Sequence, residues 1–123
     1  ARDYVEAMWL ILQHKTPDDF VIATGKQYSI KTFVEMSCRE MGIKIKWKGK
    51  GIKEKALDEN NKIIIECSKK YYRPTEVDAL LGNPAKAKKL LKWKSKTSLK
   101  SLIKEMIDSE LDRIKKNNHE KTR

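Results

Sequence analysis

The stretch Ser29–Lys48, SIKTFVEMSCREMGIKIKWK, changes at Gly42 from a helical pattern of apolar residues to a strand-like one. Before the glycine, apolar residues recur at intervals of three and four, which predicts a helix from Ile30 to Met41. After it, isoleucine or tryptophan alternates with lysine, which is typical of a half-buried strand. The pattern therefore predicts an α/β fold. The buried stripe of the helix, capped by Ser29, would contain Ile30, Phe33, Val34, Cys38 and Met41.

Toward the N-terminus, two apolar segments predict elements of a larger core. Residues 4–12 repeat with helical spacing, and Asp3 with Glu6 has the form of a capping box. Phe20–Ala23 is a continuous apolar run, which suits a strand buried on both faces. Because a helix that is apolar on several faces is usually buried against something larger, we expect the chain to be a piece of a longer protein. The apolar residues of that helix are Tyr4, Val5, Ala7, Met8, Trp9, Ile11 and Leu12.

Beyond Lys48, the pattern predicts one more strand and a short helix. Ile63–Ile65 has the composition of a strand, which we expect to pair near the first one, and the polar residues 52–61 before it are interpreted as a surface loop. Asn83 followed by Pro84 is a typical helix start, and this helix is expected to end near Leu91.

A last helix is expected from about Ser98 to Lys115, with a polar, frayed tail from Asn117. One face of this helix is apolar and the other is charged. The apolar face contains Leu99, Leu102, Ile103, Met106, Ile107, Leu111 and Ile114.

The composition limits the classes of protein to consider. The chain has 123 residues, enough for one core, and a formal net charge of +11, which favours polyanionic partners. Cys38 and Cys67 lie far apart without a CxxC pairing, so neither a disulfide framework nor a zinc site is indicated. No run approaches the roughly 20 apolar residues that span a bilayer. We expect a soluble, cytoplasmic protein with free thiols, of which Cys38 is a small buried hydrophobe.

Common catalytic motifs are missing from the sequence. Gly49-x-Gly51 lacks the strand-to-helix context and the following Lys-Ser/Thr of a phosphate-binding loop, so it is interpreted as a turn. His14 and His119 are isolated, which disfavours a metal-binding or general-base role. No Gly-x-Ser-x-Gly nucleophile elbow occurs.

The segment Tyr71–Asp78, YYRPTEVD, is the candidate binding site. Arg73 offers a planar fork of donors that matches phosphate oxygens, and the carboxylate of Glu76 can accept hydrogen bonds from ribose hydroxyls. Together they would suit a nucleotide-diphosphate ligand. Alternatively, Arg73 and Glu76 form an ion pair that stabilises the loop, with the two tyrosines packed beneath it. The residues alone leave both interpretations open.

Several segments, in order along nearly the whole chain, resemble GDP-mannose 4,6-dehydratases, a family of extended short-chain dehydrogenases/reductases. The resemblance implies that residues 1–28 are the last helix and strand of an NADP-binding Rossmann domain, that 29–116 form the small α/β substrate-binding lobe, and that 117–123 are a polar tail. The matching segments are ARDYVEAMW (Ala1–Trp9), FVIATG (Phe20–Gly25), YYRPTEVD (Tyr71–Asp78), GNPAKA (Gly82–Ala87) and LKWK (Leu91–Lys94).

By this resemblance, the intact enzyme converts GDP-mannose to the 4-keto-6-deoxy sugar with bound NADP, and works as a cytoplasmic homo-oligomer. Arg73 would contact the diphosphate of GDP-mannose and Glu76 the ribose hydroxyls. The family's catalytic residues and main NADP site would lie upstream of Ala1, so this chain would hold no catalytic, cofactor-binding or metal-binding residue and would be inactive alone. Arg2 and Asp3 would then cap the first helix rather than touch ligand.

Two features depart from the family pattern. Cys67-Ser68 stands where relatives usually carry an acidic or amide residue and a proline, and lysine is unusually frequent, especially in 44–55 and 86–100. The alternative function is therefore a small basic module that binds nucleic acid or a partner without catalysis. We interpret the lysines as a solvated surface and expect no nucleic-acid partner, since the sequence shows no aromatic stacking platform or recognition helix. We also expect no membrane partner.

Overall fold

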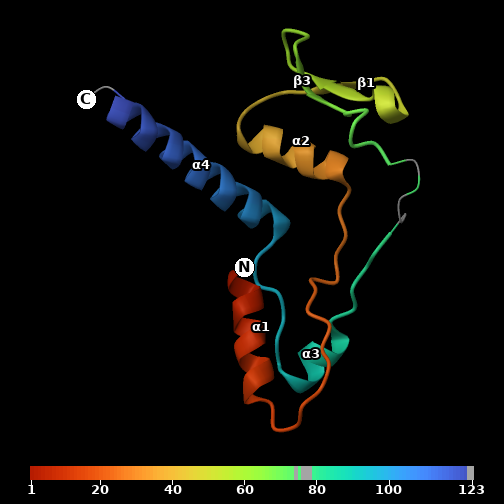
Figure 1. The fold of residues 1–123 in the computed structure, drawn as a ribbon, viewed down its shortest axis with the longest axis vertical. Coiled ribbons are helices and arrows are strands. Elements are labelled where there is room, and N and C mark those ends of the chain that lie inside the picture. The colour runs from red at the N-terminus through yellow and green to blue at the C-terminus, as the bar shows by residue number, and fades with distance from the viewer. Residues whose placement is uncertain (74, 76–78, 122–123) are drawn as a thin grey trace. The chain divides into compact units, whose positions relative to one another are not determined.

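The computed structural model describes residues 1–73, 75 and 79–121, and these residues combine helices with one small antiparallel sheet (Figure 1). They divide into two units: one consists of the described residues of Ala1–Tyr28 and Asp78–Ser101, the other of those of Ser29–Val77 and Leu102–Arg123. The predicted mixture of helix and sheet is confirmed. The elements are α1 (Arg2–Gln13), α2 (Ile30–Glu40), β1 (Lys46–Lys48), the 3-10 helix η1 (Gly51–Lys53), β2 (Lys55–Leu57), β3 (Ile63–Glu66), α3 (Ala85–Leu90) and α4 (Leu99–Lys121).

The core of the first unit is built around Trp93, whose side chain is only 1% exposed. It clusters with Leu91 and with two fully buried alanines, Ala7 of α1 and Ala87 of α3. Small residues at these two positions leave room for the indole between the helices. Four partly buried side chains complete the cluster, namely Leu10, Ile11, Phe20 and Ile22.

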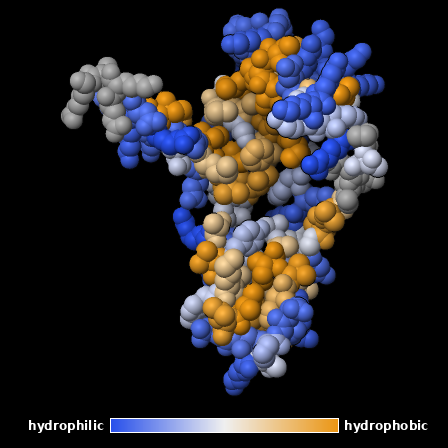
Figure 2. Space-filling view, viewed as in Figure 1, coloured by the Kyte–Doolittle hydropathy of each residue, from blue (hydrophilic) through white to orange (hydrophobic). Residues whose placement is uncertain are grey.

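Helix α1 forms as predicted, but its N-terminus and its buried face differ from the prediction. Ala1 is the N-cap and makes no side-chain capping bond, so the capping box predicted at Asp3 and Glu6 is wrong. The Asp3 carboxylate instead accepts bonds from Ser95, Lys96 and Thr97. A large apolar part of the helix stays exposed, including Trp9 at 61%, and apolar residues reach the surface over α1 (Figure 2).

The strand predicted at Phe20–Ala23 is not formed in this structure. A strand requires a neighbour to which its backbone can hydrogen-bond, and the three described strands all belong to the other unit. The segment is nonetheless held in place, because the Lys86 ammonium lies 2.7 Å from Asp18 Oδ1 and 2.8 Å from the Asp19 carbonyl. It also approaches Gly82, where an added Cβ would lie 2.6 Å from the Ala23 Cβ.

In the second unit, α2 has both predicted caps. The Ser29 hydroxyl accepts a bond from the Thr32 N–H at 3.0 Å. At the other end, Gly42 has φ of 72°, a left-handed conformation that glycine adopts without strain. The Ile43 N–H then donates to the Cys38 carbonyl at 2.8 Å, which is the characteristic long bond of a Schellman cap. Of the stripe predicted to be buried, Cys38 is buried, whereas Ile30, Phe33 and Met41 are exposed.

The sheet has the order β1-β2-β3, with both pairs antiparallel. Its central strand, β2, lies in the stretch that was predicted to be a surface loop, and its Ala56 is fully buried. That prediction is wrong because a three-residue strand is too short to show a period of two. The strand predicted at Ile63–Ile65 is present as β3, but it pairs with β2 rather than with β1.

Helix α4 begins where the sequence predicts, whereas α3 begins one residue later, with Pro84 in place of Asn83 as its N-cap. The Asn83 Oδ1 accepts a bond from the Ala85 N–H at 3.0 Å at the start of α3, and the Ser98 hydroxyl accepts one from the Ser101 N–H at 3.1 Å at the start of α4. Helix α4 continues to Lys121, beyond the end at Lys115 that the apolar pattern predicts. Ile103 is the buried residue of its apolar face.

Replacement of Gly82 by alanine tests the close approach between the segments at 20–23 and 82. On an unhindered backbone, Gly→Ala stabilises a protein by about 0.4–1 kcal/mol. Here the new Cβ would meet Ala23, so we expect Gly82→Ala to lower the free energy of unfolding by about 1–3 kcal/mol in urea denaturation. Much of this loss in free energy of unfolding should disappear when the double variant Ala23→Gly/Gly82→Ala is compared with the single variant Ala23→Gly. Equal effects in both backgrounds would contradict this packing.

The exposed face of α1 predicts that the chain self-associates or packs against another chain, because large exposed apolar patches promote association. We expect sedimentation equilibrium to show association that grows with concentration and is weakened by Trp9→Glu. Ile114→Glu is the matched control, since Ile114 is an exposed apolar residue on α4. A monomer at high protein concentration, with Trp9 protected from solvent quenchers, would contradict the prediction.

Candidate functional site

The candidate binding segment follows directly from the sheet. After β3, a turn closes with the Tyr71 N–H donating to the Ser68 carbonyl at 3.2 Å. The Cys67 thiol lies 3.8 Å from the carbonyl oxygen of Gly51, at the start of η1. The beginning of the segment is therefore tied to the edge of the small sheet.

Arg73 is exposed and makes no hydrogen bond or ion pair with the described residues 1–72, 75 and 79–121. Tyr71 and Tyr72 are 74% and 52% exposed. Glu76, the second predicted site residue, lies outside the described residues. The pairing of Arg73 with Glu76 therefore stays a prediction.

The charge around Arg73 suits an anion. Between Glu66 and Glu76 the sequence carries Lys69, Lys70 and Arg73 but no acidic residue. The Lys70 ammonium lies 5.3 Å from the centroid of the Tyr71 ring. A guanidinium among other cations attracts phosphate oxygens and can hold them with paired hydrogen bonds.

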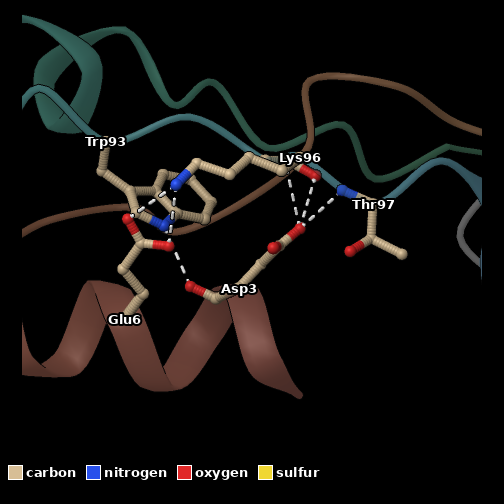
Figure 3. Close-up of polar contacts among 6 residues, drawn as sticks. Asp3, Glu6, Trp93, Lys96 and Thr97 are labelled. Atoms are coloured by element: carbon tan, nitrogen blue, oxygen red, sulfur yellow. Dashed lines mark hydrogen bonds and ion pairs between the residues drawn. The ribbon is translucent and has the colours of Figure 1, made fainter.

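Asp3 has a role that sequence reasoning missed. Its carboxylate accepts bonds from the backbone N–H groups of Lys96 and Thr97, both at 2.9 Å, and from the Ser95 hydroxyl at 3.2 Å (Figure 3). Its carbonyl accepts the indole N–H of Trp93 at 2.9 Å. These partners lie 90 or more residues away in the sequence, so no local pattern signals the contact. Asp3 thus joins the first turn of α1 to residues 93–97.

Glu6 adds an ion pair to the same place. Its carboxylate lies 3.1 Å from the Lys96 ammonium, one helical turn beyond Asp3 (Figure 3). Asp3 and Glu6, which the capping pattern had coupled to each other, both bind the segment 95–97 instead. We refer to these contacts of Asp3 and Glu6 with Trp93, Ser95, Lys96 and Thr97 as the Asp3 anchor.

The other chemistry-bearing residues have structural surroundings. His14 packs edge-on against the Phe20 ring, with 5.4 Å between ring centroids. Burial raises the pKa of the Cys38 thiol, which disfavours the reactive thiolate. Gly49 lies in the turn after β1, and Gly51 is the first residue of η1. Neither glycine lies between a strand and an α-helix, as the glycines of a dinucleotide-binding loop do.

The described residues contain no group of three or more His, Cys, Asp or Glu side chains placed to hold a metal ion. None of the helices in this part of the chain has the length and hydropathy needed to cross a membrane.

Comparison with known proteins places the chain in a family. The family model described as GDP-mannose 4,6 dehydratase matches residues 1–106. The chain belongs to the GDP-mannose 4,6-dehydratase family. The match includes the segment with Arg73, the Asp3 anchor and the whole sheet, and the resemblance found in the sequence is confirmed.

Curated relatives carry the same description. The chain is 55% identical over 116 residues to a GDP-mannose 4,6 dehydratase of Dictyostelium discoideum, 50% over 111 residues to GDP-mannose 4,6 dehydratase 2 of Caenorhabditis elegans, and 45% over 118 residues to the GDP-mannose 4,6 dehydratase of Homo sapiens. These alignments cover 94%, 90% and 95% of this chain, but 33%, 29% and 32% of the relatives. The chain spans about a third of the length of the dehydratases it matches.

The Asp3 anchor predicts a specific acid sensitivity. The N–H of Thr97, with smaller contributions from Lys96 and Ser95, holds the pKa of Asp3 below its ordinary value of 3.8. Because the folded-state pKa is the lower one, the stabilisation is complete above about pH 4 and is lost as the pH falls through the folded-state pKa. We expect the free energy of unfolding to fall more steeply below pH 4 in the native chain than in Asp3→Asn. Parallel pH profiles from urea denaturation would contradict this.

Proposed function

We propose that this chain is the nucleotide-sugar-binding part of a GDP-mannose 4,6-dehydratase, an NADP-dependent lyase that converts GDP-mannose to GDP-4-keto-6-deoxymannose. The observation that carries the proposal is the family match over residues 1–106, which includes the YYRPTEVD segment. The exposed guanidinium of Arg73, with no partner among the described residues, is in the state that a substrate-binding arginine requires before its ligand arrives.

In this proposal, Arg73 binds the diphosphate and Glu76 binds the ribose hydroxyls. A guanidinium can donate two parallel N–H bonds to phosphate oxygens, which fixes both the position and the orientation of the diphosphate. A carboxylate accepts hydrogen bonds from two hydroxyl groups, which selects a nucleotide with an intact ribose. The chain thereby positions the sugar for reaction.

The chemical steps belong to other parts of the proposed enzyme. The described residues offer no dinucleotide cradle and no cluster that could bind a metal, so we assign this chain no step of hydride or proton transfer. We propose that NADP is held by the remaining two thirds of the enzyme, that the enzyme is a cytoplasmic homo-oligomer, and that the 123-residue chain alone does not dehydrate GDP-mannose.

Substitution of Arg73 in a complete dehydratase chain tests the binding role. A charge-assisted contact to phosphate contributes about 1.5–3 kcal/mol, so Arg73→Ala should weaken GDP-mannose binding by roughly 10-fold to 150-fold in isothermal titration calorimetry. Arg73→Lys should recover only part of the affinity, since a point charge lacks the guanidinium fork. Glu76→Gln should have a milder effect, because an amide oxygen still accepts a hydroxyl bond.

Two controls separate binding from folding. Lys89→Ala removes the same charge from an exposed position on α3 and should leave the affinity for GDP-mannose unchanged. NADP affinity should hardly change in any of these variants. If Arg73→Ala lowers the melting temperature without a selective loss of GDP-mannose affinity, Arg73 is a loop-stabilising residue and the binding role is wrong.

A further inference from the structure

A pocket lies in the unit that contains the sheet, beside β1 and the last turns of α2. Its volume of about 470 Å³ is within the range of small-molecule sites. None of its lining residues belongs to the segment with Arg73. The lining residues are Glu35, Arg39, Gly42, Ile43, Lys44, Ile45 and Trp47.

One wall of the pocket is apolar and fixed. Ile43 and Ile45 precede β1, Trp47 lies within it, and all three line the pocket. The Trp47 indole N–H donates to Glu35 Oε1 at 2.9 Å, and the Lys31 ammonium lies 4.8 Å from the ring centroid. The indole is therefore held in one orientation before any ligand binds.

The charged lining is dominated by cations. The Arg39 side chain is exposed, and its guanidinium makes no hydrogen bond or ion pair within the described ranges 1–73, 75 and 79–121. Lys44 is almost fully exposed, and its only acidic partner there is Glu59, at 3.8 Å. Glu35 is the acidic residue among those that line the pocket, and one of its oxygens already accepts the Trp47 bond.

The end of α2 does not oppose an anion strongly. The carbonyl oxygens of Ser37, Cys38 and Arg39 accept the N–H groups of Met41, Ile43 and Gly42 in the C-terminal cap. Carbonyls engaged in this way expose less negative charge to the pocket than free ones would.

We propose that this pocket binds an organic monoanion, a carboxylate or sulfonate with a flat or aliphatic body. The apolar body lies against Ile43, Ile45 and Trp47, and the acidic group lies at Arg39 and Lys44. Such a ligand can form ion pairs with both cations and cover the apolar wall, whereas a neutral ligand could only cover the wall. The site is additional to the diphosphate-binding role proposed for Arg73.

A matched pair of probes tests the proposal on the 123-residue chain. In calorimetric titrations, 4-phenylbutyrate should bind about three- to tenfold more tightly than 4-phenyl-1-butanol, which has a hydroxyl in place of the carboxylate. The expected difference is small because ion pairs with partly exposed side chains contribute little to affinity. Arg39→Gln should remove most of this preference without changing the affinity for the alcohol. Arg39→Lys should keep it, and Lys89→Gln, which removes a charge from α3, should have no effect.

The indole N–H resonances locate the probe, since Trp9, Trp47 and Trp93 can be assigned by single substitution to phenylalanine. We expect the Trp47 resonance to shift on addition of 4-phenylbutyrate. The proposal is overturned if neither probe binds at millimolar concentration, if both bind equally, or if the preference survives Arg39→Gln combined with Lys44→Gln. A shift of Trp9 in place of Trp47 would equally overturn it, because the probe would then sit on the apolar face of α1.

Discussion

The Asp3 carboxylate, bound by two backbone N–H groups and a hydroxyl, is the contact on which the first unit depends. It joins the first turn of α1 to residues 95–97, which are almost the last residues before α4. Trp93 lies beside it, with its ring buried and its indole N–H bonded to the Asp3 carbonyl. Because a buried indole needs a partner for that N–H, the polar contact and the apolar core are satisfied together. Ala7 and Ala87 keep the space that this arrangement requires.

The sequence predicted the local features of the fold well. The caps of α2 at Ser29 and Gly42 depend on residues within a few positions of each other, so spacing and residue type are enough to find them. The same holds for the bond from the Ala85 N–H to Asn83 before α3. Three of the errors have a different origin. The Asp3 anchor depends on residues distant in sequence, β2 is too short to show a period, and none of the described strands pairs with the apolar run at Phe20.

The candidate site shows the same division. A guanidinium in an aromatic, basic loop indicated a phosphate ligand, but only the resemblance to a family distinguished that role from a loop-stabilising ion pair. The structure adds that Arg73 and both tyrosines are exposed. The pocket beside Trp47 was not predicted at all, since it arises where α2 and β1 meet and no single segment contains its pattern.

The alternating lysines of β1 have a simple structural explanation, because charged side chains on an edge strand oppose pairing with other chains.

The proposed binding of the GDP-mannose diphosphate by Arg73 can be tested by a crystal structure of a complete dehydratase chain containing this sequence, with GDP-mannose bound. We expect the Arg73 guanidinium at about 2.7–2.9 Å from diphosphate oxygens, with the Glu76 carboxylate at the ribose hydroxyls. A bound nucleotide sugar whose phosphates contact other residues, while Arg73 points into solvent or pairs with Glu76, would contradict it.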